Sequence, residues 1–529
     1  MNEKLRIGFL VSKTGKLPMW EFEMLQQLLN SDFVTVSVFI ATDEKQSLQG
    51  SFGYQLFTKF EDWWFRSSPD AFKRVQITEQ LQKITILKYD DPAFLYQFQL
   101  DIIYSSCLVS ADDKIISASR FGIWSINFGA GRYKNLQPPA FWEVMENEPA
   151  TGSSLEVQLP GNKKIIAVYE GLTLSVPYSV KNNLNSIAWK SSSFLPCRIH
   201  ELYILGPELF FRKYEDRSVK NQFEIIDKIK YPGSGQMLWL FIRNNLSYVI
   251  YRLIAKIRKT RFTILISRQS FTRAIDFSKF KKLELPANKF WADPFIIHND
   301  NHQFLFFEEF DYGTEKAHIS VIEIFEDNTH SDPQIVLKRP YHLSYPFVFE
   351  FEDDYYMVPE SNSNKTVELY KAANFPYEWE FVMNLMENII LIDPTLIYEK
   401  GKWWLFGNTQ YHPFTSTNDQ LLLFYSDNLI SNDWTAHPQN PVITDISNCR
   451  PAGRIFRQDG ILYRPAQNNA SQQYGYGLKI NRIVILDENE YKEEEVFEIN
   501  PNKKNNLSAI HSINFTDVLI AVDGIVANS

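Results

Sequence analysis

The second half of the chain repeats one two-strand pattern five times, and this repetition constrains the fold more than any other feature. Each copy has a polar residue, an apolar strand, a tight polar turn and a second apolar strand. Repeats of about 50 residues that each hold several strands are typical of propeller blades. The copies begin 52, 48, 57 and 61 residues apart, at Asp293, Tyr345, Asp393, Arg450 and His511. We therefore expect residues 262–529 to form an all-β five-bladed propeller.

The first part of the chain, residues 1–215, alternates short apolar strands with helical stretches. LRIGFL at 5–10, the helical segment WEFEMLQQLL and VTVSVFIA at 34–41 make one β-α-β unit. Further strands are expected at 84–87, 101–106, 122–128, 154–159 and 164–170. This alternation predicts an α/β domain with a mostly parallel, Rossmann-like sheet covered by helices.

Residues 216–261 link these two parts and contain the run QMLWLFIRNNLSYVIYRLIAKIRKTR. Its apolar residues follow helical spacing and five basic residues accompany them, so residues 237–259 are expected to form a basic amphipathic helix. Two interpretations remain open. The helix is either a connector packed between domains or an attachment to an anionic membrane surface.

Composition excludes several classes of protein. The net charge of −9 argues against a protein that coats nucleic acid, because phosphate binding needs a surplus of Lys and Arg. The three cysteines, Cys107, Cys197 and Cys449, are too scattered for a disulfide framework or a zinc site, and we expect no metal. The N-terminal apolar run is short, and no stretch reaches the roughly 18 residues of a membrane span. We expect a cytoplasmic protein, with contact at the inner membrane face through residues 237–259 as the alternative.

Aligning the repeats predicts which residues share one face of the propeller, since both ends of a hairpin lie at the same edge. Polar residues then gather in two sets. The first set is the five starting residues, and the second is Glu308, Glu360, Asn408, Arg464 and Asp523. Such a cluster is typical of a binding site, although the same residues could instead tie neighbouring blades together. Asp293 and Asp393 are the candidate base and its orienting partner.

The other members of the predicted site would bind substrate. Arg450 and Arg464 could clamp a phosphate or carboxylate, and Tyr345 and Trp291 could stack on sugar faces. The full substrate-binding set is Arg450, His511, Tyr345, Arg464, Gln467, Trp291 and Glu308. Acids, arginines and aromatic rings together favour a sugar phosphate or a glycan as ligand.

Long motifs in this half resemble a known family. WADPF, SYPFVFEFEDDYYMVPES, IDPTL, HPQNPV, RPAGRIFRQDGILYRPAQ and YGYG look like the five-bladed propeller at the N-terminus of glucosamine inositolphosphorylceramide transferases, over roughly residues 285–525. More remotely they resemble the arabinanase and β-xylosidase clan of glycoside hydrolases. That clan uses one Asp as base, a second Asp to tune the acid, and a Glu as acid. Asp293 and Asp393 match the first two.

The third position of that clan is occupied here by Arg450, which cannot protonate a leaving group. Ordinary glycoside hydrolysis then requires Glu360 or Glu308 to take over as acid. An arginine instead suits a diphosphate leaving group, whose departure needs charge neutralisation. The resemblance therefore favours glycosyl transfer.

The run from Asp101 to Gly152 resembles the folate-dependent formyltransferases. Asn127 matches the catalytic asparagine of that family, but Gly129 stands where its histidine is expected, and Gly161 or Asn162 stands in place of its aspartate. Without base and acid, formyl transfer lacks its proton handling. We expect this fold to be kept and its chemistry lost, with no folate or other cofactor bound.

Together these features predict a formyltransferase-like α/β domain at 1–215, a linker at 216–261 and a propeller at 262–529. The predicted function lies in the biosynthesis of a cell-surface polysaccharide or glycolipid, with glycosyl transfer at the propeller face. A sugar, nucleotide sugar or glycolipid would be the partner. Three alternatives remain: a sugar N-formyltransferase, a glycoside hydrolase, and a non-catalytic glycan-binding scaffold.

Overall fold

The chain divides into two compact units that part between Ile257 and Arg258, and each is described here by itself. The computed structural model describes residues 3–12, 14–42, 50–76, 85–88, 92–105, 113–129, 133–134, 136, 138–162, 164–215, 218–219, 231–257, 261–272, 275–410, 415–470, 475–501 and 507–526. Cys107, Arg258 and Lys259 lie outside the described residues.

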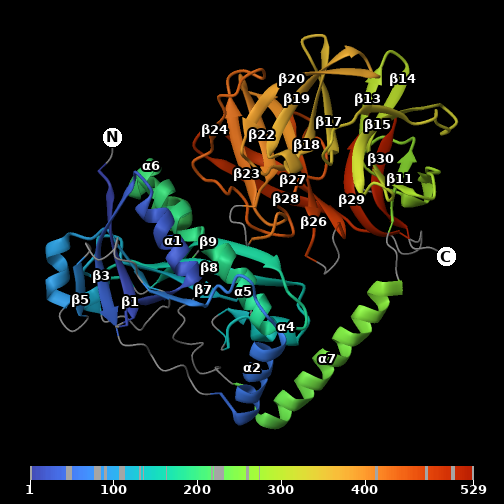
Figure 1. Cartoon of the computed structure of the whole chain (residues 1–529). Coiled ribbons are helices and arrows are strands. Elements are labelled where there is room, and N and C mark those ends of the chain that lie inside the picture. The colour runs from blue at the N-terminus through green and yellow to red at the C-terminus, as the bar shows by residue number, and fades with distance from the viewer. Residues whose placement is uncertain are drawn as a thin grey trace. The chain divides into compact units, whose positions relative to one another are not determined.

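Within the described part of the first unit, eight strands form one sheet in the order β10-β9-β8-β7-β6-β1-β3-β5 (Figure 1). Their bounds are β1 Leu5–Ser12, β3 Val34–Thr42, β5 Thr85–Lys88, β6 Ile102–Ser105, β7 Ile123–Phe128, β8 Ala150–Gln158, β9 Ile165–Leu174 and β10 Ser218–Val219. A small antiparallel pair, β2 (Lys16–Pro18) and β4 (Arg74–Gln76), accompanies it.

This sheet is more mixed than the expected parallel one. Neighbouring strands in the part of the sheet ordered β5-β3-β1-β6-β7 pair in parallel. The pairs β7 with β8, β8 with β9 and β9 with β10 are antiparallel. The short connection from Gln158 to Ile165 explains part of the difference. A parallel pair needs a crossover of a dozen or more residues, whereas a short loop can join only antiparallel strands. The α/β character is confirmed, and the likeness to formyltransferases stays a prediction.

Seven helices belong to the described part of this unit. They are α1 Met19–Leu29, α2 Phe52–Trp64, α3 Asp113–Ile116, α4 Phe141–Met145, α5 Val180–Ser191, α6 Phe194–Tyr214 and α7 Ser234–Ile257, with a 3₁₀ segment at Pro92–Phe98. The buried face of α1 carries Trp20, Met24 and Leu28, which join one large core with Trp124 on β7. Apolar residues at helical spacing thus cover the sheet, as the sequence pattern predicts.

In the described part of the second unit, five four-stranded antiparallel sheets form the blades (Figure 1). Four blades use consecutive strands: β13 Lys289–Asn299, β14 His302–Asp311, β15 Lys316–Ile324, β16 Gln334–Leu337; β17 Ser344–Phe351, β18 Asp354–Ser361, β19 Thr366–Asn374, β20 Glu378–Glu387; β21 Ile392–Glu399, β22 Lys402–Asn408, β23 Leu421–Ser426, β24 Thr435–Ala436; and β25 Phe456–Gln458, β26 Ile461–Asn468, β27 Gly477–Leu486, β28 Tyr491–Ile499. The predicted five-bladed propeller is confirmed.

The fifth blade joins strands from both ends of the propeller. Its order is β12-β11-β30-β29. Strand β11 (Phe262–Ser267) pairs with β30 (Ile520–Val526) of the final hairpin, whose other strand is β29 (Leu507–Phe515), and β12 (Lys281–Lys282) pairs with β11. The repeat at His511 is therefore the hairpin of a blade whose outer strands come from the start of the unit. The pairing of β11 with β30 therefore joins the first and last strands of the propeller in one blade.

Candidate functional site

Three residues that begin sequence repeats share an unusual backbone. Asp293, Tyr345 and Asp393 each precede a proline and have φ values of 51°, 43° and 52°. In each blade the pairing between the first two strands shifts register at this point, so each residue sits in a β-bulge. A bulge redirects one side chain out of the regular alternation of a strand. The repeated polar residue thus faces a different direction from its apolar neighbours.

The backbone amides at these bulges are held by carboxylates from the neighbouring blade. The N–H of Asp293 donates to Asp523 Oδ2 at 2.9 Å, and the N–H of Tyr345 donates to Asp293 Oδ2 at 3.2 Å. In the next blade the N–H of Asp393 donates to Glu360 Oε2 at 2.9 Å. These contacts show that the acids do tie neighbouring blades together, which was the alternative interpretation of the polar set.

His511 lies between two of these carboxylates. Its Nδ1 is 3.0 Å from Asp523 Oδ2 and 3.3 Å from Asp293 Oδ1, and all three side chains are buried. Within the described residues, this is the one group of His, Cys, Asp or Glu whose ligand atoms are close enough to hold a metal ion. The imidazole has a charge-assisted hydrogen-bond partner at Nδ1 in Asp523 Oδ2, whereas the buried Asp293 Oδ1 has no hydrogen-bond partner among the described residues.

Asp393 is held by two partners from the fourth blade. Arg450 donates from Nε to Asp393 Oδ2 at 2.6 Å and from Nη2 to Oδ1 at 3.3 Å. Gln467 donates to Asp393 Oδ2 at 3.2 Å and to the Pro451 carbonyl at 2.9 Å. The guanidinium fork expected to clamp a ligand phosphate is therefore engaged with a protein carboxylate, and it orients Asp393.

Two further buried carboxyls, those of Glu308 and Glu360, belong to the site, and the pKa of each is strongly raised. Burial, followed by the nearby Asp293 and Glu360 carboxylates, raises the pKa of Glu308 well above its usual range. Burial and Asp393 likewise raise the pKa of Glu360, although Arg450 opposes this shift. In both carboxyls burial is the largest cause of the raised pKa, because it disfavours the charged form. Glu308 also interacts electrostatically with His511, and Glu360 interacts with Asp393 and Arg450.

Several predicted site residues lie elsewhere. Arg464 is buried in an ion pair with Glu493 at 2.7 Å and donates to the Asn448 carbonyl at 2.6 Å, so it braces the fourth blade. Trp291 is buried with its ring 4.6 Å from that of Phe307, and does not stack toward a ligand. A local sequence pattern leaves the face that such a strand side chain takes undetermined, because a shift of one residue turns it to the opposite face.

Tyr345 and Asn408 are also internal. The Tyr345 hydroxyl accepts the Gly453 N–H at 2.9 Å and lies 2.9 Å from Thr395 Oγ1, so it links three blades and is fully buried. Asn408 donates to the Thr417 carbonyl at 3.3 Å and is buried too. The expectation that Tyr345 stacks on a sugar does not fit this position.

The sequence alignment missed two residues at the same site. Asn418 accepts from Arg450 Nη1 at 2.6 Å, and His342 places Nε2 3.4 Å from Glu308 Oε1. Both lie in loops before a strand, outside the repeated hairpin motif, so the alignment carried no signal for them. The side chains of His342 and Arg450 are 32% and 12% exposed, whereas the carboxyls behind them are nearly inaccessible.

The residues matched to formyltransferases form a different arrangement. Asn127, near the end of β7, donates to Glu156 Oε2 at 3.4 Å, and Glu156 pairs with Lys134 at 2.8 Å. Gly129 has φ of 110°, and a Cβ there would lie 2.4 Å from the Tyr133 carbonyl oxygen. The backbone at Gly129 therefore excludes the side chain of a histidine. Gly161 and Asn162 lie in the exposed turn between β8 and β9.

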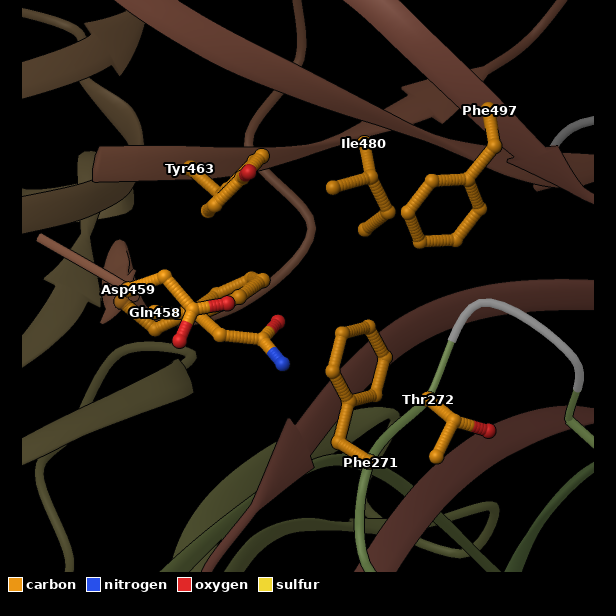
Figure 2. A pocket seen from close by; sticks show the side chains of 8 residues that line it. Phe271, Thr272, Gln458, Asp459, Tyr463, Ile480 and Phe497 are labelled. Atoms are coloured by element: carbon orange, nitrogen blue, oxygen red, sulfur yellow. The ribbon is translucent and has the colours of Figure 1, made fainter. Parts of the chain in front are cut away.

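A separate aromatic pocket opens at the fourth and fifth blades (Figure 2). Its volume is about 170 Å³, and Figure 2 shows the rings of Phe271, Tyr463 and Phe497 around it with Gln458 and Asp459 at one side. The residues that line it are Phe271, Thr272, Phe456, Gln458, Asp459, Tyr463, Ile480 and Phe497. None of the predicted site residues is among them.

Comparison with known sequences finds a family match in the second half of the chain. Residues 275–514 match the family described as "Glucosamine inositolphosphorylceramide transferase 1, N-terminal". The propeller matches the N-terminal domain of this transferase family. The predicted resemblance of the C-terminal half is thereby confirmed.

Relatives that carry this transferase name are plant proteins. The chain is 37% identical to glucosamine inositolphosphorylceramide transferase 1 of Oryza sativa subsp. japonica over 214 residues, which is 40% of this chain and 28% of the relative. It is 32% identical to the transferase of the same name from Arabidopsis thaliana over 234 residues, which is 44% of this chain and 30% of the relative. The chain thus spans less than a third of the length of these relatives.

Solved structures with lower similarity include glycoside hydrolases. A family 117 glycoside hydrolase of Zobellia galactanivorans is 12% identical with a TM-score of 0.33, covering 50% of this chain and 90% of that one. The catalytic domain of the GH62 α-L-arabinofuranosidase of Coprinopsis cinerea is 11% identical with a TM-score of 0.35, covering 50% of this chain and 97% of that one.

Proposed function

We propose that the transferase-family propeller binds a sugar at its central site and acts in glycosyl transfer during glycolipid biosynthesis. The observation that carries this proposal is the connected group of buried carboxyls contributed by different blades, two of which have a strongly raised pKa. Buried ionisable groups with perturbed pKa values are characteristic of catalytic sites. The names of the relatives supply the class of acceptor, an inositolphosphorylceramide-like lipid.

The arrangement suggests a division of roles. Asp293, whose Oδ1 lies 3.3 Å from His511 Nδ1, would accept the proton of the acceptor hydroxyl as that oxygen attacks the anomeric carbon. The bond from the anomeric carbon to the leaving group then breaks, and the leaving oxygen takes a proton from Glu308 or keeps its charge as a diphosphate. Glu308 is the better candidate acid because its Oε1 lies near His342, on the more accessible side. Asp393, held by Arg450, orients Glu360 through its own amide.

A glycoside hydrolase remains a second candidate, and the raised pKa of Glu308 and Glu360 favours it. Arg450 occupies the expected position of the acid, but Glu308 and Glu360, whose pKa is raised, are candidate acids close by. The two functions differ in the acceptor. A hydrolase releases free sugar in water, whereas a transferase needs the lipid hydroxyl.

The first unit is proposed to have no formyltransferase activity. The support is the backbone at Gly129, where any side chain would meet the Tyr133 carbonyl. Incubation of the full chain with formyltetrahydrofolate and a nucleotide-linked amino sugar should therefore yield no formylated product by mass spectrometry.

The transfer test uses the full chain, a uridine-diphosphate amino sugar and inositolphosphorylceramide, with the glycolipid product followed by mass spectrometry. Asp293→Asn removes the charge at the proposed base and should lower turnover by about 10²–10⁴-fold. Asp459→Asn is the matched control, because Asp459 has nearly the same backbone, with φ of 52° against 51° for Asp293, but lies in an exposed turn. It should leave turnover unchanged. A fully active Asp293→Asn protein would refute the proposed site, and sugar release without the lipid would favour the hydrolase.

A further inference from the structure

One face of the long helix α7 is apolar and open to solvent. Among its described side chains, seven large apolar residues have exposed fractions from 48% for Ile250 to 61% for Leu238. They are Leu238, Trp239, Ile242, Leu246, Val249, Ile250 and Leu253. At about 100° per residue these positions form one continuous stripe along the helix. Soluble proteins rarely expose a contiguous apolar surface of this kind without a partner.

The opposite face of α7 already has its partner within the first unit. Met237 and Leu240 are buried in a cluster with Phe57 of α2 and Phe141 of α4, and the ring of Phe241 lies 4.9 Å from that of Phe60. Helix α7 therefore has two apolar faces, one buried against α2 and α4 and one exposed. A helix with apolar residues all round is typical of burial in protein or contact with a membrane.

Helix α2 runs parallel to α7 and adds to this surface. The N–H of Gly53 donates to Ser234 Oγ at 3.2 Å, and Phe60 meets Phe241 seven residues further along both helices. We measure angles around each helix from the side that faces the other helix, viewed from the N-terminus. The exposed apolar residues of α2 then lie about 90° anticlockwise, and those of α7 lie about 110° clockwise. For two parallel helices side by side, both directions point to the same side.

We call this surface the α2–α7 face. On α2 it comprises Phe52, Leu56 and Trp63, which are 69%, 51% and 71% exposed, with Trp64 at the junction of the helices at 56%. On α7 it comprises the seven residues of the stripe. Tryptophan is enriched where proteins meet the boundary between water and lipid, because its ring is apolar and its N–H is polar.

The charge around this face has one sign. Residues 228–275 contain ten basic residues and no acidic residue, in a chain whose net charge is −9. The guanidinium of Arg243 lies 4.7 Å from the ring of Trp239, at one edge of the stripe, and position 252 lies at the other edge. Of the two acids on α2, Glu61 is buried and Asp62 is 2.9 Å from Lys181 Nζ. The face is thus apolar with a basic border.

We propose that the α2–α7 face docks onto an anionic lipid bilayer. Its apolar side chains would enter the outer part of one leaflet while the bordering basic residues meet the lipid phosphates. Among the residues that the structure describes, no helix is long and apolar enough to pass through a bilayer. At about 1.5 Å per residue, the 24 residues of α7 extend about 36 Å along the surface. The charge favours lipid over a second copy of the chain, since two such borders would repel each other.

This inference rests on the first unit alone and does not depend on the proposed transferase activity. The test measures co-sedimentation of the full chain with vesicles of phosphatidylcholine and phosphatidylglycerol, compared with vesicles of phosphatidylcholine alone. We expect binding to the anionic vesicles to be at least about tenfold stronger, and to weaken with salt because exposed charges are screened. Replacing both Ile242 and Leu246 by Asp should reduce binding at least about tenfold.

Leu209→Asp serves as the matched control, because Leu209 is 50% exposed on α6 and lies outside the face. It should bind vesicles as the wild type does, and all variants should keep the wild-type unfolding temperature since each change is at an exposed site. Absence of vesicle binding by the wild type, or equal binding by the Ile242→Asp/Leu246→Asp variant, would overturn the proposal. So would a wild-type dimer that the double variant converts to a monomer, because the face would then be covered by a second copy.

Discussion

Tyr345 shows how single residues carry the connections of the propeller. A bulky residue with φ of 43° is strained, and the residue before a proline normally prefers an extended backbone. The strain is offset by fixed partners, because Asp293 accepts its amide proton and its hydroxyl accepts the N–H of Gly453. Each of these contacts joins a different blade to the second. The strained position is thus over-determined by its neighbours, as is usual where such backbones persist.

Removing the hydroxyl tests this description of Tyr345. Tyr345→Phe keeps the ring but leaves the buried Gly453 N–H without its acceptor, so it should lower the free energy of unfolding by about 1–3 kcal/mol. Urea denaturation measures the change. Tyr398→Phe is the control, because Tyr398 is 52% exposed in the same propeller, and it should be nearly neutral. Equal stability of the two variants would contradict the assigned role.

Gly129 offers a second test at the same scale. Gly129→Ala places a Cβ 2.4 Å from a carbonyl oxygen, whereas Gly161→Ala meets nothing within 4 Å, although both glycines have positive φ. Both variants incur a backbone cost of about 1–2 kcal/mol. Gly129→Ala should destabilise the first unit clearly further, as measured by thermal unfolding. Similar unfolding temperatures would show that the loop relaxes freely and that a catalytic side chain could have been accommodated there.

At the scale of elements, helix α4 buries the carboxyl of Glu143, and burial makes the charged form of this group unfavourable. Glu143 is 2% exposed, and burial raises the pKa of its carboxyl to about 7. In the unfolded chain the same carboxyl titrates near 4.5. Between these values the unfolded chain releases the proton while the folded protein keeps it. Folding stability therefore falls as the pH rises through this window and is flat below it.

Glu143→Gln should remove this pH dependence. The variant should match the wild type near pH 4.5 and gain up to about 1.4 kcal/mol of relative stability for each pH unit up to about 7. Unfolding temperatures across this pH range give the measurement. Glu208→Gln, at an exposed position of α6, should show no such divergence. A constant difference between wild type and Glu143→Gln would mean that Glu143 ionises normally in the folded protein.

At the scale of the whole molecule, the propeller depends on strands that precede its repeats. Strand β11 pairs with β30 over six residues, and Ile264 and Ile266 are fully buried in the interior of the closing blade. The family match begins at residue 275, after β11. The folding unit is therefore longer than the matched segment, because the ring is closed by pairing between its two ends.

Two segments of different length test this closure. Residues 258–529 should fold alone into a cooperatively unfolding propeller, as judged by circular dichroism and urea denaturation. Residues 285–529 lack β11 and β12, and should lose about 1.5–3 kcal/mol for each of Ile264 and Ile266 while exposing the edge of β30 to aggregation. If the shorter segment folds with equal stability, the closing strands are dispensable and the description of the fifth blade is wrong.

The sequence by itself determined the number of blades, the hairpin in each repeat and the positions of Asp293, Asp393 and His511 at the starts of the repeats. Local periodicity suffices for this, because alternation of apolar residues and turn-forming residues acts within about ten residues of chain. The same local reasoning identified the apolar and basic character of α7. It could not identify the sides of the helix that are covered.

Only the tertiary structure decided which polar residues meet. Arg450 is engaged with Asp393, Arg464 with Glu493, and Asn418 reaches the site from a loop outside the repeats. It also supplied β11 as the closing strand and the parallel packing of α2 on α7. These outcomes depend on strand register and on contacts between residues far apart in the chain. A shift of one residue in a strand turns its side chain to the opposite face, so a local pattern leaves the partners of a polar side chain undetermined.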